Sequence, residues 1–336
     1  MKLLAALGIL SVLGSCLWQT AQVASARPAE PFVLVIEEQK SAEGERSRAE
    51  GMQTLRLLTA DGVVRIDADE YLTCVVLSEL PASFCEETMK AQAVAARTYA
   101  FRALTHGKHA DADLCDDPAC CQAFSSKQTL RERLGDAFDA AWDKASSAVA
   151  ETEDLILCSG GEPIEAVYYS CSGGRSEDAV AVWGGDVPYL RSVDSPGEEF
   201  APRFESEVCV PFSEFRAKLE RESGEASFSV LPQDWIGKAT YTNGGAVDTI
   251  VLGGVRFSGT RVRSLFALPS AKFTVGVESD AVSFRCRGYG HGVGMSQYGA
   301  EAMARAGKDW REIVAHYYTG VEIKKLSRSE SGQWAA

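Results

Sequence analysis

The sequence lacks an excess of positive charge. Its 336 residues include 34 Lys and Arg against 47 Asp and Glu, which gives a formal net charge of −13. A chain this acidic is a poor candidate for binding nucleic acid without sequence preference, because the phosphate backbone attracts basic surfaces. We therefore expect no nucleic-acid partner.

Several motifs that mark nucleotide and metalloprotease chemistry are also missing. The sequence contains neither a Walker A motif nor HExxH. The glycine-dense segment 288–299, GYGHGVGMSQYG, does not have the GxGxxG register, because Val293 or Met295 stands where the third glycine belongs. A dinucleotide site is therefore not expected. Internal repeats are absent too.

Long apolar runs are confined to the N-terminus. Lys2 precedes the apolar run Leu3–Trp18, and the small residues Ala24-Ser25-Ala26 offer a cleavage site. We assign residues 1–26 to a signal peptide or membrane anchor, and a lipoprotein modified at Cys16 stays open as a third interpretation. All three predict export, with the rest of the chain as one body at the extracytoplasmic face of the membrane.

The remaining sequence has the composition of a globular protein, with 46% hydrophobic and 24% charged residues. Helical patterns gather near both ends of a β-rich middle, which predicts an α+β fold. We expect a β-rich body with a buried Ala-rich helix beside a substrate groove, either as one body or as two lobes. Residues 27–50 form a polar linker, residues 51–323 the domain, and residues 324–336 a disordered tail.

Secondary-structure signals divide the domain into short elements. The run Tyr71–Leu77 fits either a strand or a buried helix. Helices are expected from Ser83 to Gly107 and at Leu134–Ala150, Pro211–Ser223, Ala300–Ala306 and Trp310–Tyr318. Strands are expected at Thr54–Leu58, Val63–Ile66, Leu155–Leu157, Ile164–Tyr169, Thr240–Tyr241, Val247–Leu252, Val255–Phe257 and Phe273–Val277.

The Ala-rich helix has the clearest local signals. Ser83 and Glu86 fit a capping box, and Pro81 keeps the preceding residue out of the helical region. Lys90 and Arg97 are seven residues apart and should share one face. A solvated edge is the ordinary interpretation of two such cations.

A carboxylate, Glu79, stands directly before this helix. It follows the apolar run Val75–Leu77 and precedes Pro81. Partial burial would raise its pKa, as a general acid requires near neutral pH. A lone glutamate before a helix is ordinarily a solvated surface residue, and that alternative stays open.

The ten cysteines suggest disulfide bonds or a metal site. Disulfides are the ordinary expectation in an exported protein. Cys115, Cys120 and Cys121 are too crowded to be ordinary partners of one another, which directs attention to a metal. His109, Cys115 and Cys121 are spaced by six and six, and imidazole with thiolates suits Zn²⁺. His106 and Cys120 are nearby alternatives, and disulfides beside an unrelated histidine remain possible.

Four stretches, taken together and in this order, resemble the stage II sporulation protein D family over residues 50–323. They are ELPASFCEETMKAQAVAARTYA, THGKHADADLCDDPACCQAF, YYSCSGGRSEDAVAVWGGDVPYLRSV and RGYGHGVGMSQYGAEAMARAGKDWREIVAHYYTGV. The resemblance implies a membrane-anchored lytic transglycosylase that cleaves peptidoglycan glycan strands during engulfment of the forespore. It also implies a partner amidase and a membrane scaffold protein.

The resemblance implies roles for particular residues. Glu79 matches the family's catalytic glutamate, and Lys90 and Arg97 match positions that support it. Arg97 could orient Glu79 or bind a substrate oxygen. The set His109, Cys115 and Cys121 matches a zinc site of some members, with a structural role for the metal.

Two later motifs offer further site residues. Tyr169 departs from the histidine of many members, so Ser170 is the safer assignment in that motif. His291 and Gln297 are the polar groups of the glycine-rich segment, whose alternate glycines let a backbone pass close to a flat group such as a sugar ring. A structural tight loop is the alternative for that segment. Cys171 as a nucleophile with His291 as its base is a further alternative.

Two classes of function follow. The first is a lytic transglycosylase that cleaves the bond between N-acetylmuramic acid and N-acetylglucosamine, leaves a 1,6-anhydro end, and uses Glu79 as its only acid and base. The second is a wall-binding module that activates an amidase without cutting glycan, as the name "amidase enhancer" of related proteins suggests.

Overall fold

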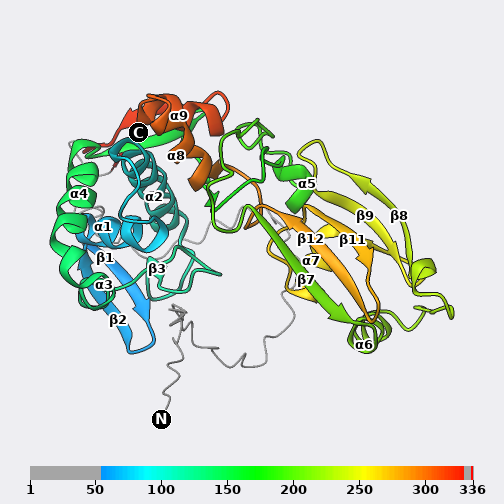
Figure 1. Ribbon diagram of the computed structural model, residues 1–336. Coiled ribbons are helices and arrows are strands. Elements are labelled where there is room, and N and C mark those ends of the chain that lie inside the picture. Colours follow the sequence, from blue (N-terminus) through cyan, green and yellow to red (C-terminus); the bar gives the residue numbers. More distant parts are fainter. Residues whose placement is uncertain (1–53, 329–333, 336) are drawn as a thin grey trace, which may run out of the picture. The chain divides into compact units, whose positions relative to one another are not determined.

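The computed structural model describes residues 54–328 and 334–335. The expected signal or anchor segment 1–26 and the linker 27–50 fall outside the described residues. Helices and small sheets alternate along the rest of the chain (Figure 1), which confirms the α+β class. The division into two lobes stays a prediction.

The described chain begins with a hairpin. Strands β1 (Thr54–Thr59) and β2 (Gly62–Asp67) pair antiparallel around the turn at Ala60 and Asp61, as the turn signal predicted. Strand β3 (Leu114–Cys115) pairs parallel with the other edge of β1. The candidate metal ligand Cys115 is therefore fixed to a sheet.

Helix α1 (Ala68–Glu79) follows the hairpin, so the run Tyr71–Leu77 is a buried helix rather than a strand. The side chain of Asp67 caps its first turn by accepting two backbone N–H groups. The helix ends because Pro81 disfavours helical backbone at Leu80, which is extended with φ −113° and ψ 145°. Glu79 is therefore the last helical residue.

The Ala-rich helix α2 (Glu86–His106) is buried along most of its length, as expected. It contacts α1, α4 (Phe138–Glu151), β4 (Leu155–Ser159), α8 (Gln297–Arg305) and α9 (Trp310–Tyr317), several of which surround it in Figure 1. Fully buried alanines such as Ala93 and Ala96 leave room for these neighbours to approach closely. The helix ends at Gly107, which adopts a left-handed conformation with φ 68°.

The predicted capping box of α2 is wrong. Ser83 lies outside the helix, and the N-cap residue is Cys85, whose side chain makes no capping bond. The buried carboxylate of Glu301 on α8 takes that role instead: its Oε2 accepts hydrogen bonds from the Cys85 N–H and the Thr88 hydroxyl, both at 2.8 Å. A charged acceptor from a distant helix has replaced the local one.

The segment after α2 differs from expectation in its boundaries. Helix α3 (Lys127–Leu134) and a 3-10 turn (Gly135–Ala137) precede α4, so the helix expected from Leu134 starts at Phe138. Strand β4 lies between β5 (Glu162–Pro163) and β14 (Glu322–Lys325). Lys324 and Lys325, expected in the disordered tail, therefore belong to a strand. Beyond them, β15 (Ser327–Arg328) pairs with β16 (Trp334–Ala335).

The strand expected at Ile164–Tyr169 is reduced to β6 (Tyr168–Tyr169), which pairs parallel with β13 (Met295–Ser296). This short pairing brings the YYSC motif beside the glycine-rich segment. Helix α8 starts immediately after β13, and α9 follows it. Two of the four motifs named above thus meet at one place.

The middle of the chain forms a separate aromatic core. Its elements are α5 (Ala179–Trp183), β7 (Glu205–Pro211), α6 (Phe212–Glu222), a 3-10 turn (Pro232–Trp235), β8 (Ile236–Tyr241), β9 (Val247–Leu252), β10 (Val255–Ser258), α7 (Gly259–Phe266), β11 (Phe273–Val277) and β12 (Ala281–Arg287). Two three-stranded sheets, ordered β10-β9-β8 and β11-β12-β7, pack with helices α6 and α7 around Phe215, Trp235, Phe266 and Phe284.

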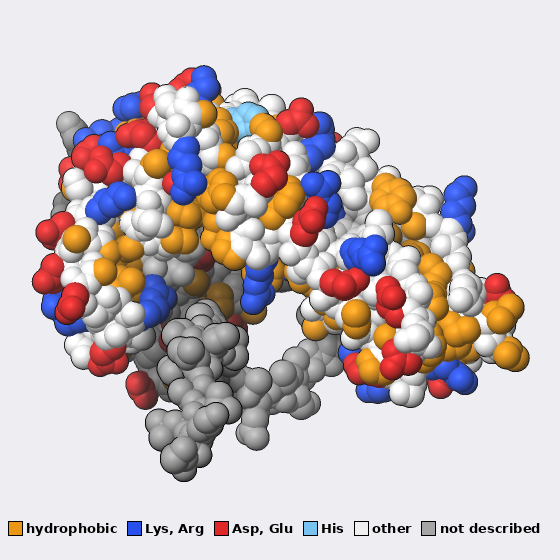
Figure 2. All heavy atoms as spheres, in the orientation of Figure 1, with side chains coloured by type: hydrophobic (Ala, Val, Ile, Leu, Met, Phe, Trp, Pro, Cys, Tyr) orange, Lys and Arg blue, Asp and Glu red, His pale blue; other side chains and the backbone are white. Residues whose placement is uncertain are grey.

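Acidic and basic side chains are intermixed on the face shown in Figure 2, so the net charge of −13 does not gather there as a single-sign field. Within the described ranges, 54–328 and 334–335, no helix has both the length and the apolar character needed to cross a membrane.

Replacing Glu301 by alanine should destabilise the fold by about 2 kcal/mol, because the first turn of α2 loses a buried charged cap. Glu301→Gln, which keeps one acceptor oxygen, should lose less. Urea unfolding measures both. Glu220→Ala removes an exposed glutamate paired with Arg216 at 3.8 Å and serves as the control, with an expected change below about 0.5 kcal/mol. Equal losses in Glu301→Ala and the control would contradict the capping role.

Candidate active site

Glu79 is the centre of a half-buried polar site. Its Oε1 accepts the backbone N–H of Ala123 at 2.9 Å, and its Oε2 accepts the side-chain amide of Gln297 at 2.9 Å. The carboxylate thus joins the end of α1, the segment after the cysteine cluster and the first residue of α8. Gln297, which the sequence proposed as a substrate-facing group, is a direct partner of Glu79.

Burial raises the pKa of the Glu79 carboxyl. Hydrogen bonds from Gln297 and Ala123, and the nearby Tyr168 hydroxyl, oppose the shift, but the loss of solvent is the larger effect. In the described part of the chain, no Lys or Arg is among the groups that set this pKa. Glu79 therefore has the environment of a carboxylic acid that keeps its proton to higher pH than an exposed one.

A second layer of polar groups extends the site. The Tyr168 hydroxyl donates to Gln122 Oε1 at 2.8 Å, and Gln122 Nε2 donates to the Tyr71 hydroxyl at 3.1 Å. Neither Tyr168 nor Gln122 was predicted from the sequence as a site residue. Neighbouring strand residues point to opposite faces, so only one of Tyr168 and Tyr169 can point toward Glu79. The sequence does not show which face of β6 lies toward α1.

Tyr169 and Ser170 do not reach Glu79 through any of their hydrogen bonds. Tyr169 is buried, its hydroxyl has no hydrogen-bond partner among the described residues, and its ring lies 5.3 Å from that of His291. The carbonyl of Ser170 accepts the N–H of Tyr298 at 3.0 Å. These two residues position the strand that presents Tyr168.

Lys90 and Arg97 share one face of α2, as their spacing predicted, but that face packs against the end of α4. Arg97 is buried and donates to the carbonyls of Thr152 at 2.6 Å and Val149 at 2.9 Å. Lys90 pairs with Glu87 at 2.9 Å and with Glu151 at 2.7 Å. The expected orienting contact between Arg97 and Glu79 is absent from the described structure, because the guanidinium is engaged by the Val149 and Thr152 carbonyls at the end of α4.

His291 is a fixed neutral histidine. Its Nδ1 accepts the N–H of Val293 at 3.1 Å, so the proton lies on Nε2, which donates to the Tyr168 carbonyl at 3.1 Å. Burial lowers its pKa to about 4. Cys171 instead contacts Glu198 at 3.1 Å, and burial raises the pKa of its thiol to about 12. The described contacts therefore do not support a Cys171–His291 nucleophile pair.

The glycines of the GYGHGVG segment pass close to the protein itself. A Cβ on Gly290, where φ is +121°, would lie 2.7 Å from the Cβ of Tyr169. A Cβ on Gly294, where φ is +77°, would lie 2.2 Å from the carbonyl oxygen of Val167. The glycines thus let this segment approach the strand that carries Tyr168 and Tyr169. This agrees with the alternative that the segment is a structural tight loop.

A buried carboxylate, Glu198, fixes the start of α8. It accepts the Ser172 N–H at 2.7 Å and the hydroxyl of Ser296 at 2.6 Å. Ser296 is the N-cap of α8, and Gln297 is its first residue. Glu198 therefore helps to set where the Gln297 amide meets Glu79. The sequence offered no signal for it, because it is a single acidic residue in a loop.

Four metal-ligand side chains converge after α2. The donor atoms of His109, Cys115, Cys120 and Cys121 all lie within 4.8 Å of one another, and His109 Nε2 is 3.3 Å from Cys121 Sγ. Donors of a tetrahedral zinc site with bonds near 2.3 Å are about 3.8 Å apart, so the set fits such a site. His106 bonds elsewhere, to the carbonyl of Arg102 at 3.0 Å. The nine cysteines of the described residues are all free of disulfides.

The cysteine cluster is directly connected to Glu79. Cys121 is followed by Gln122, which binds Tyr168, and by Ala123, whose N–H binds Glu79. Tyr99 of α2 donates to the Cys120 carbonyl at 3.2 Å. Anything that fixes the cluster also fixes two donors of the polar site.

Comparison with known proteins gives the family. A model of the stage II sporulation protein family, SpoIID, matches residues 59–158. The chain is 36% identical over 303 residues to stage II sporulation protein D of Bacillus subtilis (strain 168), covering 86% of each chain. It is 34% identical over 302 residues to the protein of the same name from Bacillus amyloliquefaciens, covering 89% of this chain and 86% of the relative. The chain belongs to the stage II sporulation protein D family.

A more distant relative carries a different name. The chain is 26% identical over 301 residues to a Bacillus subtilis (strain 168) protein called amidase enhancer, covering 74% of this chain and 39% of that protein. The resemblance drawn from the four motifs is thus confirmed for the family and for its link to amidase enhancers.

Arg97→Ala should lower the free energy of unfolding by about 3 kcal/mol, because it removes the buried hydrogen bonds to the carbonyls of Val149 and Thr152 and leaves the space of a large buried side chain unfilled. Lys90→Ala, which removes the ion pairs to the partly exposed Glu87 and Glu151, is the matched control and should cost about 1 kcal/mol or less. Guanidinium unfolding measures both. If Arg97→Ala were as stable as wild type but inactive, Arg97 would instead be a residue that supports Glu79, as the family resemblance implied.

Proposed function

We propose that this chain is a lytic transglycosylase that cleaves peptidoglycan glycan strands, with Glu79 as its only acid and base. Membership of the family supports a role in sporulation that is related to the cell wall. The observation that carries the enzymatic proposal is a carboxyl group whose pKa is raised by burial and which is held by neutral donors from two other segments.

The reaction needs one group that first gives and then takes a proton. Protonated Glu79 donates to the oxygen that bridges N-acetylmuramic acid and N-acetylglucosamine, and the bond from that oxygen to C1 breaks. The Glu79 carboxylate then removes the proton from the muramic C6 hydroxyl, whose oxygen bonds to C1. The product is a 1,6-anhydro end, and no water is consumed. A second carboxylate, as in hydrolytic glycosidases, is not required.

The neighbours of Glu79 suit both stages. The Ala123 N–H and the Gln297 amide hold the carboxyl group in one orientation. They also stabilise the carboxylate that remains after the first proton transfer. Because both donors are neutral, they do not abolish the raised pKa on which the first stage depends.

A non-catalytic activator of an amidase is the second candidate. The similarity to a protein called amidase enhancer favours it. The enzymatic proposal is preferred because Glu79, unlike the buried Glu301 with its partner Arg305, meets neutral donors and has a raised pKa, as a general acid requires.

Glu79→Gln should fold normally and lose glycan cleavage by at least about 10²-fold, because it removes the proton donor. The Gln297 amide can turn over to preserve a hydrogen bond with the new amide. Mass analysis of purified glycan strands after digestion measures the anhydro products.

Glu70→Gln is the matched control, since it makes the same substitution at an exposed position of the same helix and should cleave as wild type. Release of anhydro products by Glu79→Gln at the wild-type rate would overturn the assignment. Binding of glycan by wild type with no products would favour the activator.

We further propose that His109, Cys115, Cys120 and Cys121 hold a zinc ion. Three thiolates and one imidazole complete a four-coordinate set, and such closed sites are structural rather than catalytic. Bound zinc would supply a cross-link between β3, the loop after α2 and the segment that carries Gln122 and Ala123. Cys120, which the sequence offered only as an alternative, is part of this set.

Metal analysis of the purified chain should find one zinc per molecule. Cys121→Ser should lose the metal and melt at a lower temperature, whereas Cys209→Ser, at an exposed cysteine, should do neither. In the cobalt-substituted protein, Cys120→Ser should weaken the thiolate-to-metal absorption. Protein purified without chelators that lacks stoichiometric zinc would reject the site, and an unchanged cobalt spectrum would remove Cys120 from it.

We also propose that the chain is exported and lies at the extracytoplasmic face of the membrane. There it would act beside a partner amidase and a membrane scaffold protein. The family resemblance and the apolar N-terminal run support them.

A further inference from the structure

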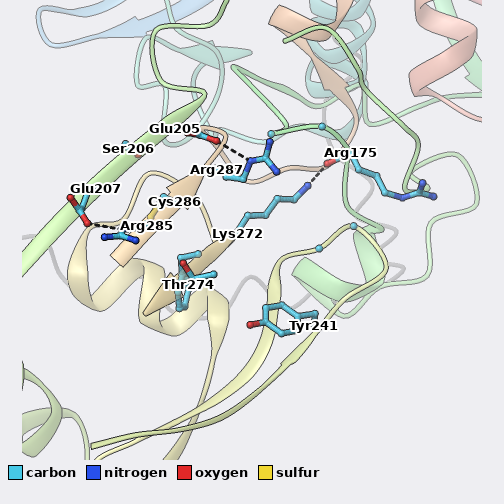
Figure 3. Close-up of a pocket in the computed structure, with 15 residues that line it drawn as sticks. Arg175, Glu205, Ser206, Glu207, Tyr241, Lys272, Thr274, Arg285, Cys286 and Arg287 are labelled. Atoms are coloured by element: carbon cyan, nitrogen blue, oxygen red, sulfur yellow. Dashed lines mark hydrogen bonds and ion pairs between the residues drawn. The ribbon is translucent and has the colours of Figure 1, made fainter. Parts of the chain in front are cut away.

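A pocket of about 660 Å³ lies over the sheet β11-β12-β7. Its floor comes from the three strands, and its walls come from Gly173–Arg175 and from the turn between β8 and β9, with Tyr241 (Figure 3). None of the residues assigned above to the Glu79 site or the metal cluster lines it. The pocket therefore needs a separate explanation.

The two faces of this sheet differ in character. Phe273 and Phe284 point into the aromatic core on one side. On the other side, strand register places Thr274, Arg285 and Glu207 in one row, and Arg287 and Glu205 in the next. Because strand side chains alternate, these polar groups share the face that floors the pocket.

The pocket presents both signs of charge. Arg285 pairs with Glu207 at 3.0 Å and Arg287 with Glu205 at 3.6 Å, and all four side chains are 45–72% exposed. Exposed ion pairs of this kind contribute little to the stability of the fold. A charged group of a ligand can therefore replace either partner at a small cost in free energy. The two rows thus offer cationic and anionic contacts side by side.

A buried cation stands at the end of these rows. The side chain of Lys272 is only 11% exposed, lies 3.6 Å from the buried Glu177 carboxylate and also donates to the carbonyl of Arg175. Figure 3 shows it reaching toward Arg175 above the strand. Its position is fixed by these two contacts, unlike the freely exposed arginines.

Tyr241 supplies the apolar contact. Its side chain is on the wall opposite Thr274, and the residue is 59% exposed, which makes it one of the most exposed large hydrophobic residues among those described. An exposed aromatic ring beside charged groups is typical of binding sites, since it buries the alkyl parts of a ligand. The ligand should therefore combine charges of both signs with short aliphatic segments.

We propose that this pocket binds the peptide stem of peptidoglycan, an inference that rests on the proposed wall substrate. The stem carries several carboxylates and, where it contains a diamino acid, an ammonium group. Its carboxylates would contact Arg285, Arg287 and Lys272, and its ammonium group Glu205 or Glu207. Carboxylates also occur on the lactyl groups of glycan from which the stem has been removed, but such strands lack the cation that the two glutamates match.

Calorimetric titration of the full-length chain tests this with three probes: a wall tetrapeptide containing diaminopimelate, a disaccharide bearing that peptide, and glycan free of peptide. Arg285→Ala combined with Arg287→Ala should weaken binding of both peptide-bearing probes at least tenfold and leave peptide-free glycan unaffected. Tyr241→Ala should weaken them as well, and added salt should reduce wild-type binding.

Arg216→Ala is the control, since it removes an exposed arginine from helix α6 that does not line the pocket. Absence of tetrapeptide binding by wild type, or equal binding by the double variant, would overturn the inference. A loss confined to peptide-free glycan would assign the pocket to the sugar strand instead. Glu79→Gln should bind the tetrapeptide as wild type does, so failure of stem binding and failure of cleavage are separate outcomes.

Discussion

The arrangement depends on burying one carboxyl group, that of Glu79, among neutral donors. Burial raises its pKa, and the Ala123 N–H and the Gln297 amide fix its direction without supplying a positive charge. Each of the three segments that meet there is held by something else. Pro81 ends α1, the cysteine cluster precedes Ala123, and Glu198 fixes the start of α8 through Ser296. Much of the surrounding fold therefore acts to place a single acid.

Buried charges elsewhere serve as joints between distant segments. Glu301 caps α2 from α8, and Arg97 binds the carbonyls at the end of α4. Arg97 donates to several backbone carbonyls, and Glu301 accepts from a backbone N–H, the Thr88 hydroxyl and the Arg305 guanidinium, so both meet the condition under which a buried charge is tolerated. These contacts also help to explain how α2 can pass through the fold with small alanine side chains at many of its buried positions: the Glu301 contact at its start and the Arg97 contacts along one edge fix its position, and the alanines leave room for neighbouring elements.

The sequence predicted the features that depend on local chemistry. The hairpin turn before Gly62, the Ala-rich helix, the shared face of Lys90 and Arg97, and the grouping of His109 with the cysteines were all expected. The partners of these groups could not be predicted, because they lie far away in the chain. Ser83 was predicted to cap the start of α2, but the acceptor there is Glu301, which lies more than 200 residues later in the chain. Which of Tyr168 and Tyr169 points toward Glu79 depends on which face of β6 each side chain occupies. A strand of two residues is too short to show an alternating pattern from which that face can be predicted.

The proposed chemistry requires Glu79 to retain its proton to higher pH than an ordinary glutamate. A carbon-13 NMR titration of the glutamate carboxyl groups measures this directly, with the Glu79 signal assigned by its absence from Glu79→Gln. Burial of the carboxyl group predicts a midpoint clearly above the ordinary value of about 4.3. A midpoint at or below that value would show that its hydrogen bonds outweigh its burial, and would contradict the assignment of Glu79 as the acid.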